Sequence, residues 1–253
     1  MNKASGIRKP INVAEVTSVS LSNETAPLPD GVIRGLSIDN LIFGLDGSEL
    51  KVLLIKHGEG IRMGDWALPG GWIKQEEDLR DAARRLLRDL TGVEHPYLSQ
   101  LKTFGKVNRY PAERVVTVAY YALVSAYDYA LMAGFSASEA DWFNVHDLPP
   151  LVFDHQEILE YGIKHLQHEV RHHPVGFNLL PEKFTLLQLQ ELYEAILDAK
   201  LDKPNFRRKI MKMNLLTTCN EKQQGVAHRA ANLYRFDKNA YAQLTEQGFT
   251  FEV

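Results

Sequence analysis

A helix bounded by glycines constrains the fold of this chain more than any other stretch. Gly70 and Gly71 precede a run in which apolar residues recur at helical spacing, and the run closes at Gly92. Spacings of three and four residues place apolar side chains on one face of an α-helix. A glycine just past the last turn can take the left-handed conformation that ends a helix. The predicted apolar face consists of Leu79, Ala82, Ala83, Leu86 and Leu90.

The spacing within this stretch resembles the Nudix box, a loop–helix motif. The motif runs glycine, five residues, glutamate, seven residues, Arg-Glu-x-x-Glu-Glu and a closing glycine. Helices after Gly-Gly loops are common, so an accidental match is the alternative. The resemblance implies an α/β (α+β) fold, a Nudix-type α/β/α sandwich with helices on both faces of a mixed sheet. The residues that match are Gly71, Glu77, Arg85, Gly92 and Val93.

The helix departs from the motif at the positions that bind metal in Nudix hydrolases. The family has glutamates where this chain has Leu86, Asp89 and Leu90. Divalent metals such as Mg²⁺ take hard oxygen ligands, and leucine offers none. Glu77 and Asp89 alone do not easily assemble the usual cluster. We therefore expect no catalytic residue, no metal site and no cofactor, with a Nudix hydrolase that uses an unconventional ligand as the alternative.

Composition is that of an ordinary globular protein. The chain has 253 residues, of which 45% are hydrophobic and 24% charged, enough for one large domain or two small ones. Its single cysteine, Cys219, excludes an internal disulfide and favours a reducing compartment. No apolar run approaches the length of a membrane span, and the first thirty residues do not resemble a secretory signal. We expect a cytoplasmic protein without a membrane partner.

The apolar pattern predicts three segments. Residues 1–33 are polar, contain prolines and show no period, which indicates an N-terminal extension. Residues 34–173 hold several strand-like runs, with a hairpin signal at Asp46-Gly47, and form the predicted Nudix-like domain. Residues 174–253 are more helical and basic and form a second predicted domain. Its first stretch, Pro174–Pro181, is predicted to be a connection, because prolines and glycines are typical of turns.

A helix predicted from Asp154 to about His172 contains His168-Glu-Val-Arg-His172, which matches the zinc-peptidase motif H-E-x-x-H. The spacing places both histidines on one face, as zinc binding requires. However, Leu166 lies on the apolar face, and two residues of helical rotation turn His168 away from it. A catalytic zinc needs a walled cleft, so the interpretation as a surface pair is favoured.

The second domain is predicted to contain two helices and a ribbon. Thr185 is a natural N-cap for the first helix, and a compact basic helix spans Asn205–Met213. A strand-like run follows at Asn232–Phe236. This order is typical of a winged helix-turn-helix, whose second helix enters the DNA major groove while the wing contacts the flanking backbone. A small helical cap with a salt-bridged exterior is the alternative.

Charge favours the winged-helix interpretation. Residues 200–238 hold ten Lys/Arg and three Asp/Glu, a net charge of +7, whereas the rest of the chain carries −10. A basic segment on an acidic protein indicates a polyanionic partner. Arginines and lysines on the second helix reach base edges or phosphates. The candidate DNA-binding residues are Asn205, Arg207, Arg208, Lys209, Lys212 and Arg229.

A Nudix frame without metal glutamates, followed by a winged helix, resembles the Nudix-related transcriptional regulators of bacteria. The similarity covers about residues 34–236 and includes Phe153-Asp-His155, Gly176-Phe-Asn-Leu-Leu-Pro181 and Asn205-Phe-Arg-Arg208. It implies a homodimeric repressor that binds a palindromic operator in double-stranded DNA and senses a small molecule through its Nudix-like domain. Some members respond to ADP-ribose and others to a sugar such as L-arabinose. This chain looks closer to the sugar-responsive branch, with ADP-ribose as the alternative effector.

The predicted effector site follows from how proteins bind sugars. A sugar is held by aromatic faces and a few hydrogen-bonding groups in a concave site. Each candidate residue has an alternative role as a core aromatic or a surface charge. We expect the bound effector to weaken operator binding. The candidates are Lys56, Trp66, Arg109, Glu113 and Arg114.

Overall fold

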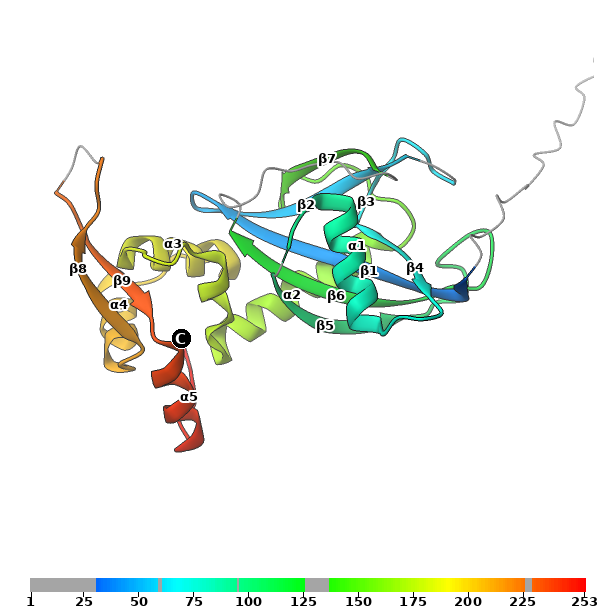
Figure 1. Ribbon diagram of the computed structural model, residues 1–253. Helices are drawn as coiled ribbons and strands as arrows, with labels where there is room; N and C mark the ends of the chain where they lie inside the picture. Colours follow the sequence, from blue (N-terminus) through cyan, green and yellow to red (C-terminus); the bar gives the residue numbers. More distant parts are fainter. Residues whose placement is uncertain (1–30, 59–60, 95, 126–136, 226–228) are drawn as a thin grey trace, which may run out of the picture.

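The part of the chain that this computed structural model describes comprises residues 31–58, 61–94, 96–125, 137–225 and 229–253. Residues 1–30 of the predicted extension lie outside it. The end of that predicted segment belongs to the fold, because the first strand begins at Val32. Figure 1 shows a sheet covered by helices at the right and a smaller, mainly helical unit at the left.

A seven-stranded mixed sheet forms the centre of the larger unit. Its strands run in the order β3-β2-β1-β6-β5, while β4 pairs with β1 and β7 pairs with β2. The predicted turn at Asp46-Gly47 joins β1 and β2 in an antiparallel hairpin, and β1 pairs with β6 in parallel. The strands are β1 (Val32–Asp46), β2 (Glu49–His57), β3 (Trp66–Ala67), β4 (Gly70–Lys74), β5 (Tyr97–Phe104), β6 (Val116–Ser125) and β7 (Ala137–Asn144).

Side chains alternate between the two faces of this sheet, since successive residues of a strand point in opposite directions. On β1, Ile38 and Ile42 belong to the apolar cluster beneath helix α1 (Leu79–Thr91). Leu41 and Phe43 belong to the cluster beneath α2 (His155–His172). Helices α1 and α2 thus lie on opposite sides of the sheet (Figure 1). The predicted α/β/α sandwich is confirmed.

Helix α1 begins and ends as its sequence predicts. Gly92 follows its last turn with φ at 74°, and the Gly92 N–H donates to the carbonyl of Arg88 at 2.8 Å. The predicted apolar face is buried except at its first residue, Leu79, which is partly buried against the same cluster. A left-handed residue after the helix favours glycine, because glycine has no Cβ to clash with the backbone.

The smaller unit has the winged helix-turn-helix plan predicted from sequence. Helix α3 begins with a capping box, in which the Thr185 hydroxyl accepts from the Gln188 N–H and the Gln188 side chain accepts from the Thr185 N–H. The ribbon of β8 and β9 is antiparallel. The elements are η1 (Pro174–Leu179, a 3₁₀ helix), α3 (Leu186–Leu197), α4 (Lys203–Lys212), β8 (Leu216–Lys222), β9 (Asn232–Phe236) and α5 (Lys238–Glu246).

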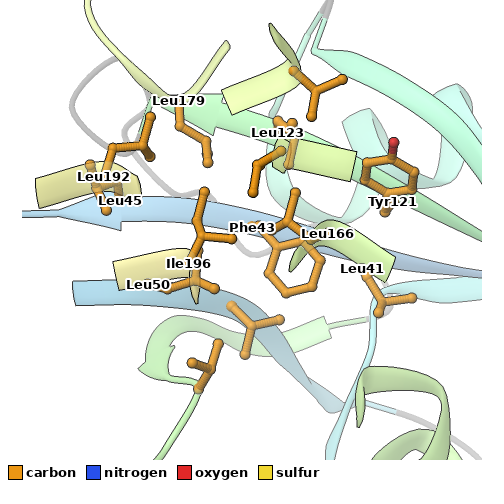
Figure 2. Packing of buried hydrophobic residues seen from close by; sticks show 14 of the residues in the cluster. Leu41, Phe43, Leu45, Leu50, Tyr121, Leu123, Leu166, Leu179, Leu192 and Ile196 are labelled. Atoms are coloured by element: carbon orange, nitrogen blue, oxygen red, sulfur yellow. The ribbon is translucent and has the colours of Figure 1, made fainter. Parts of the chain in front are cut away.

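One apolar core runs through both units. The segment predicted as a connection, Pro174–Pro181, contains η1, which packs against β6, α2 and α3. Figure 2 shows Phe43 and Leu123 of the sheet in the same cluster as Leu192 and Ile196 of α3. The two units are therefore packed together rather than joined by an exposed linker.

The C-terminal residues make a second set of contacts between the two units. After α5, which the sequence interpretation did not predict, Phe251 returns to the shared core and is 2% exposed. The Val253 N–H donates to the carbonyl of Arg171, at the end of α2, at 3.0 Å. Among the helices that the structure describes, none is long and apolar enough to cross a membrane.

Candidate functional site

The glutamate of the Nudix-like loop is bound by arginine. Arg85 of α1 donates to Glu77 through Nε at 2.8 Å and through Nη2 at 2.5 Å. The backbone N–H of Lys74 donates to the same carboxylate at 2.7 Å. The hydrogen bonds from Arg85, above all, lower the pKa of Glu77, because they stabilise its charged form. This carboxylate is ionised, but its oxygens already have partners.

The helix positions that carry glutamates in Nudix hydrolases do not offer a metal site here. Leu86 is 7% exposed and Leu90 is 4% exposed, and both pack into the core beneath α1. Asp89 is exposed and paired with Arg88 at 3.0 Å. No group of three or more His, Cys, Asp or Glu side chains within the described residues is placed to hold a metal ion. The residues present do not fit the divalent metal of a Nudix hydrolase.

The zinc-peptidase-like motif lies on the surface of α2, as predicted. His168 and His172 are both exposed, with ring centroids 4.4 Å apart. Nδ1 of His172 lies 2.9 Å from the carbonyl oxygen of His168. Leu166 and Val170 take the buried face of the helix. The two histidines lack the walled cleft that a catalytic zinc requires.

One face of α4 presents the candidate DNA-binding groups to solvent. Asp202 caps the helix by accepting from the Asn205 N–H at 3.0 Å, and Phe206 and Ile210 bury the opposite face. Arg208 donates to the side chain of Asn205, which holds the guanidinium along the helix surface. Residues at i, i+3, i+4 and i+7 share a helical face. The exposed face is formed by Asn205, Arg208, Lys209 and Lys212.

Arg207 differs from its neighbours. It lies on the flank of α4 and is only partly exposed, and its Nε is buried without a hydrogen-bond partner among the described residues. Arg229 is exposed between β8 and β9, the position of the predicted wing. The structure thus places five of the six predicted residues on the exposed surface of the smaller unit, and Arg207 partly within it. Their contacts with DNA remain predictions.

We expect Arg208→Ala to weaken DNA binding by about 1–3 kcal/mol and to relax sequence preference, as loss of a base-reading arginine does. Arg207→Ala is the matched comparison, because the side chain is equally charged but turned toward the protein. We expect a smaller loss of affinity from it. Fluorescence anisotropy with a selected duplex and a scrambled duplex measures both. Equal losses for the two variants on both duplexes would contradict this assignment of the DNA-facing side.

The predicted effector residues fall into two groups. Lys56 and Trp66 lie together at the β2–β3 edge, with Nζ of Lys56 4.8 Å from the centroid of the Trp66 ring. Lys56 also forms an ion pair with Glu139 at 2.5 Å, and Trp66 packs against Phe143 at 4.7 Å between ring centroids. Both side chains therefore have structural partners within the sheet.

The other three residues come from the loop between β5 and β6. Arg114 donates to the carbonyl oxygens of Gly105 and Lys106 and so holds the loop in shape. Glu113 is exposed. Arg109 is buried, with 4% of its side chain exposed, and it belongs to an ionic cluster. Two cavities in the described part of the chain are large enough for a ligand, and Arg109 is the only one of the five predicted effector residues that lines one of them.

The ionic cluster joins β1, this loop and the start of α2. Arg109 donates to both carboxylate oxygens of Asp154 at 2.8 Å and to Asp39 at 3.0 Å. Burial, the largest influence, lowers the pKa of His155, so its ring is neutral. Its Nδ1 accepts from the Leu68 N–H at 2.9 Å, which leaves the proton on Nε2, 3.6 Å from Asp39. We call Asp39, Arg109, Asp154 and His155 the Arg109 cluster.

A cavity of about 770 Å³ opens beside this cluster. Phe153 forms part of its wall and has a φ of 51°, a left-handed conformation that residues other than glycine rarely adopt. The ring centroid of Phe153 lies 5.0 Å from that of Tyr110. Strained residues concentrate at functional sites. Phe153 and Asp154 line this cavity but are not among the predicted effector residues, although both lie in the Phe153-Asp-His155 similarity.

A larger cavity, of about 1360 Å³, lies between the end of α2, η1 and the β8–β9 ribbon. Its wall includes Phe177 and Phe236, whose rings stack at 4.3 Å between centroids. Glu182 and Arg235, which also line it, lie 3.4 Å apart. These two charged side chains of the wall therefore pair with each other.

Comparison with known proteins identifies both units. The NUDIX domain family matches residues 34–162, and the family described as "NrtR DNA-binding winged helix domain" matches residues 176–236. The "ADPR responsive transcriptional repressor NtrR" of Acinetobacter baylyi is 32% identical over 210 residues, which cover 81% of this chain and 83% of the relative. The chain belongs to the NrtR-type family of Nudix-related transcriptional regulators. The resemblance to these regulators is confirmed.

A solved NrtR-type structure agrees with the fold across both units. The crystal structure of Shewanella oneidensis NrtR complexed with a 27mer DNA is 31% identical, with a TM-score of 0.74 over 85% of this chain and 97% of that chain. The "ADP-ribose pyrophosphatase" of Methanocaldococcus jannaschii is 31% identical over 117 residues, 46% of this chain and 68% of the relative. The first similarity spans both units, whereas the second covers a stretch shorter than the Nudix-like domain.

The predicted placement in the sugar-responsive branch is not supported by these comparisons. The regulator that matches most of the chain carries an ADP-ribose response in its name, so the alternative effector fits the NrtR-type family better than L-arabinose. The sequence interpretation chose a sugar because the loss of metal removed the usual anchor of a diphosphate. A diphosphate can also be held by cationic side chains and backbone N–H groups, without metal.

Proposed function

We propose that this protein is a transcriptional repressor that binds operator DNA through α4 and releases it when ADP-ribose binds the Nudix-like domain without being hydrolysed. The observation that carries the proposal is the combination of an exposed basic face on α4 with a Nudix helix whose metal positions are buried leucines. The first feature serves DNA binding. The second removes the metal that hydrolysis uses while keeping the fold that binds the nucleotide.

Loss of catalysis follows from the chemistry of the helix. Hydrolysis of a diphosphate needs a metal that polarises the phosphoryl oxygens and activates water. Leu86 and Leu90 offer no oxygen, and Glu77 is engaged by Arg85. Turning Leu86 or Leu90 outward would expose apolar surface from the core beneath α1. We infer that a bound nucleotide stays intact long enough to act as a signal.

The effector site that we propose is the cavity of about 770 Å³ beside the Arg109 cluster. Ligand sites commonly enclose 300–1,000 Å³ and combine apolar surface with a few polar groups. Here Phe153 supplies a ring, and Lys106 and Asn108 supply donors. The carboxylates of Glu157 and Glu160 supply acceptors for hydroxyl and amino groups. An adenine ring, ribose hydroxyls and phosphates call for these kinds of partner. The ADP-ribose response of the Acinetobacter relative supports the same ligand.

We expect ADP-ribose to weaken binding of a duplex selected from genomic DNA, with a factor of about 5–150 as in typical linkage between two sites. Fluorescence anisotropy of the labelled duplex, with and without ADP-ribose, measures the factor. L-arabinose and AMP serve as matched controls, and we expect neither to change the affinity. An unchanged affinity with ADP-ribose, or a response to L-arabinose alone, would overturn the proposed effector.

A further inference from the structure

The Arg109 cluster is a buried charged group that the proposed DNA contacts do not use. It contains two carboxylates and one guanidinium, and the neutral His155 adds no charge. The partial positive charge at the N-terminus of a helix offsets an adjacent carboxylate. Asp154 stands at this position, immediately before α2. The buried charges are therefore balanced only while the loop, β1 and α2 keep their relative positions.

The loop that carries Arg109 also forms the wall of the effector cavity. Lys106, Asn108 and Pro111 line that cavity on the loop side. The loop meets α2 a second time through Lys106, whose Nζ lies 2.5 Å from Glu157. A ligand that moves this loop acts on the first turn of α2 through both ion pairs. The exposed Lys106 pair is weak, because water screens it. The buried hydrogen bonds from Arg109 to Asp154 and Asp39, which we call the Arg109 fork, are not screened in this way.

Helix α2 reaches from this loop to the winged helix. Its 18 residues span about 27 Å at 1.5 Å per residue. Near its far end, Gln167 donates to the carbonyl of Ile196 on α3 at 3.0 Å. Leu166 and Val170 enter the core that α3 shares. A helix with both ends packed moves as a rigid element, so a shift at its N-terminus is carried to α3.

We propose that Arg109 is the positioning residue that couples the effector cavity to the winged helix, by fixing the β5–β6 loop to the start of α2. The ligand does not need to contact Arg109; it needs to displace the loop by enough to alter the fork on Asp154 and Asp39. The inference rests on the proposed function for the identity of the ligand. The path through α2 rests on the contacts alone.

The test is Arg109→Lys, which keeps the positive charge but lacks the planar fork that bonds two carboxylates at once. Arg114→Lys is the matched control, since Arg114 belongs to the same loop but bonds to the loop's own carbonyl oxygens. DNA affinity with and without ADP-ribose, and ADP-ribose affinity by calorimetry, are measured for both. We expect the factor by which each ligand weakens binding of the other to fall from about 5–150 to about 1 in Arg109→Lys. Because Arg109 also lines the effector cavity, this factor, and not the ADP-ribose affinity itself, is the readout for coupling. Arg114→Lys should keep the parent factor.

Hydrogen exchange of the protein without ligand provides a second readout. We expect Arg109→Lys to raise amide exchange in the first turn of α2 and also at the end of α3, near Ile196. Arg114→Lys should raise exchange in the loop only. Should Arg109→Lys destabilise the fold, Glu157→Gln, which removes only the exposed Lys106 pair, should lower the coupling factor in part while the protein remains folded.

The two proposals fail in different ways. A parent protein that ignores ADP-ribose overturns the proposed effector, and the exchange data then decide the coupling role of Arg109. The coupling role is wrong if the parent protein and Arg109→Lys respond equally to ADP-ribose and the variant changes amide exchange only within the loop. In that case the signal reaches α3 by a route that does not pass through this fork.

Discussion

Leu192→Ala in the winged helix should destabilise the Nudix-like domain. Leu192 is fully buried on α3 and belongs to the core that both units share. Truncating a buried leucine to alanine costs about 2–5 kcal/mol, because it removes apolar contacts and leaves a cavity. The three tryptophans, Trp66, Trp72 and Trp142, all lie in the Nudix-like domain, so their fluorescence reports on that domain alone. We expect the urea midpoint measured by fluorescence to fall.

The matched control is Leu187→Ala on the same helix, where the side chain is exposed. We expect its midpoint to stay within the range of about ±0.5 kcal/mol that surface substitutions show. Far-ultraviolet circular dichroism reports on the helices of both units and should follow the same transition as fluorescence. Two separate transitions, with the fluorescence midpoint unmoved by Leu192→Ala, would show that the units unfold independently.

The purified protein should not hydrolyse ADP-ribose at rates typical of enzymes, about 1–10³ s⁻¹, with Mg²⁺ or Mn²⁺ present. The reason is the absence of oxygen ligands at Leu86 and Leu90, together with the engagement of Glu77 by Arg85. Release of AMP, followed by chromatography, measures the rate. Glu77→Gln and Asp89→Asn are the matched variants, because they remove the two carboxylates that remain.

Any background rate should be the same in the parent protein and in both variants, because we propose that neither carboxylate takes part in hydrolysis. Metal-dependent turnover at enzyme rates that Glu77→Gln abolishes would favour the alternative, a hydrolase with an unconventional ligand set.

Local sequence signals predicted most of the secondary structure. The closing glycine of α1, the Asp46-Gly47 turn and the Thr185 cap each act within a few residues, so their consequences can be read from the chain alone. Strand β4 was missed because Gly70 and Gly71 are typical of a loop. In the fold they pair with β1, and a Cβ on Gly70 would come within 2.5 Å of the Ile38 carbonyl oxygen on that strand.

Features that depend on distant residues were not predicted. The Arg109 cluster joins positions 39, 109 and 154, and no spacing in the sequence connects them. Lys56 and Trp66, which were predicted for the effector pocket, lie at the sheet edge with partners of their own, and their contact with an effector stays a prediction. The segment from Pro174 was predicted as a connection because prolines and glycines are typical of turns. Its burial depends on η1 meeting β6, α2 and α3.

The central claim is that this protein binds ADP-ribose and DNA at two separate sites, and that each ligand weakens binding of the other. Calorimetric titration of ADP-ribose into the protein, alone and saturated with the selected duplex, tests it most directly. Linkage requires DNA to weaken ADP-ribose binding by the same factor by which ADP-ribose weakens DNA binding, about 5–150. We predict that weakening, with one heat of binding and no later heat from hydrolysis. Equal ADP-ribose affinity in both titrations, or no binding in either, would contradict the account.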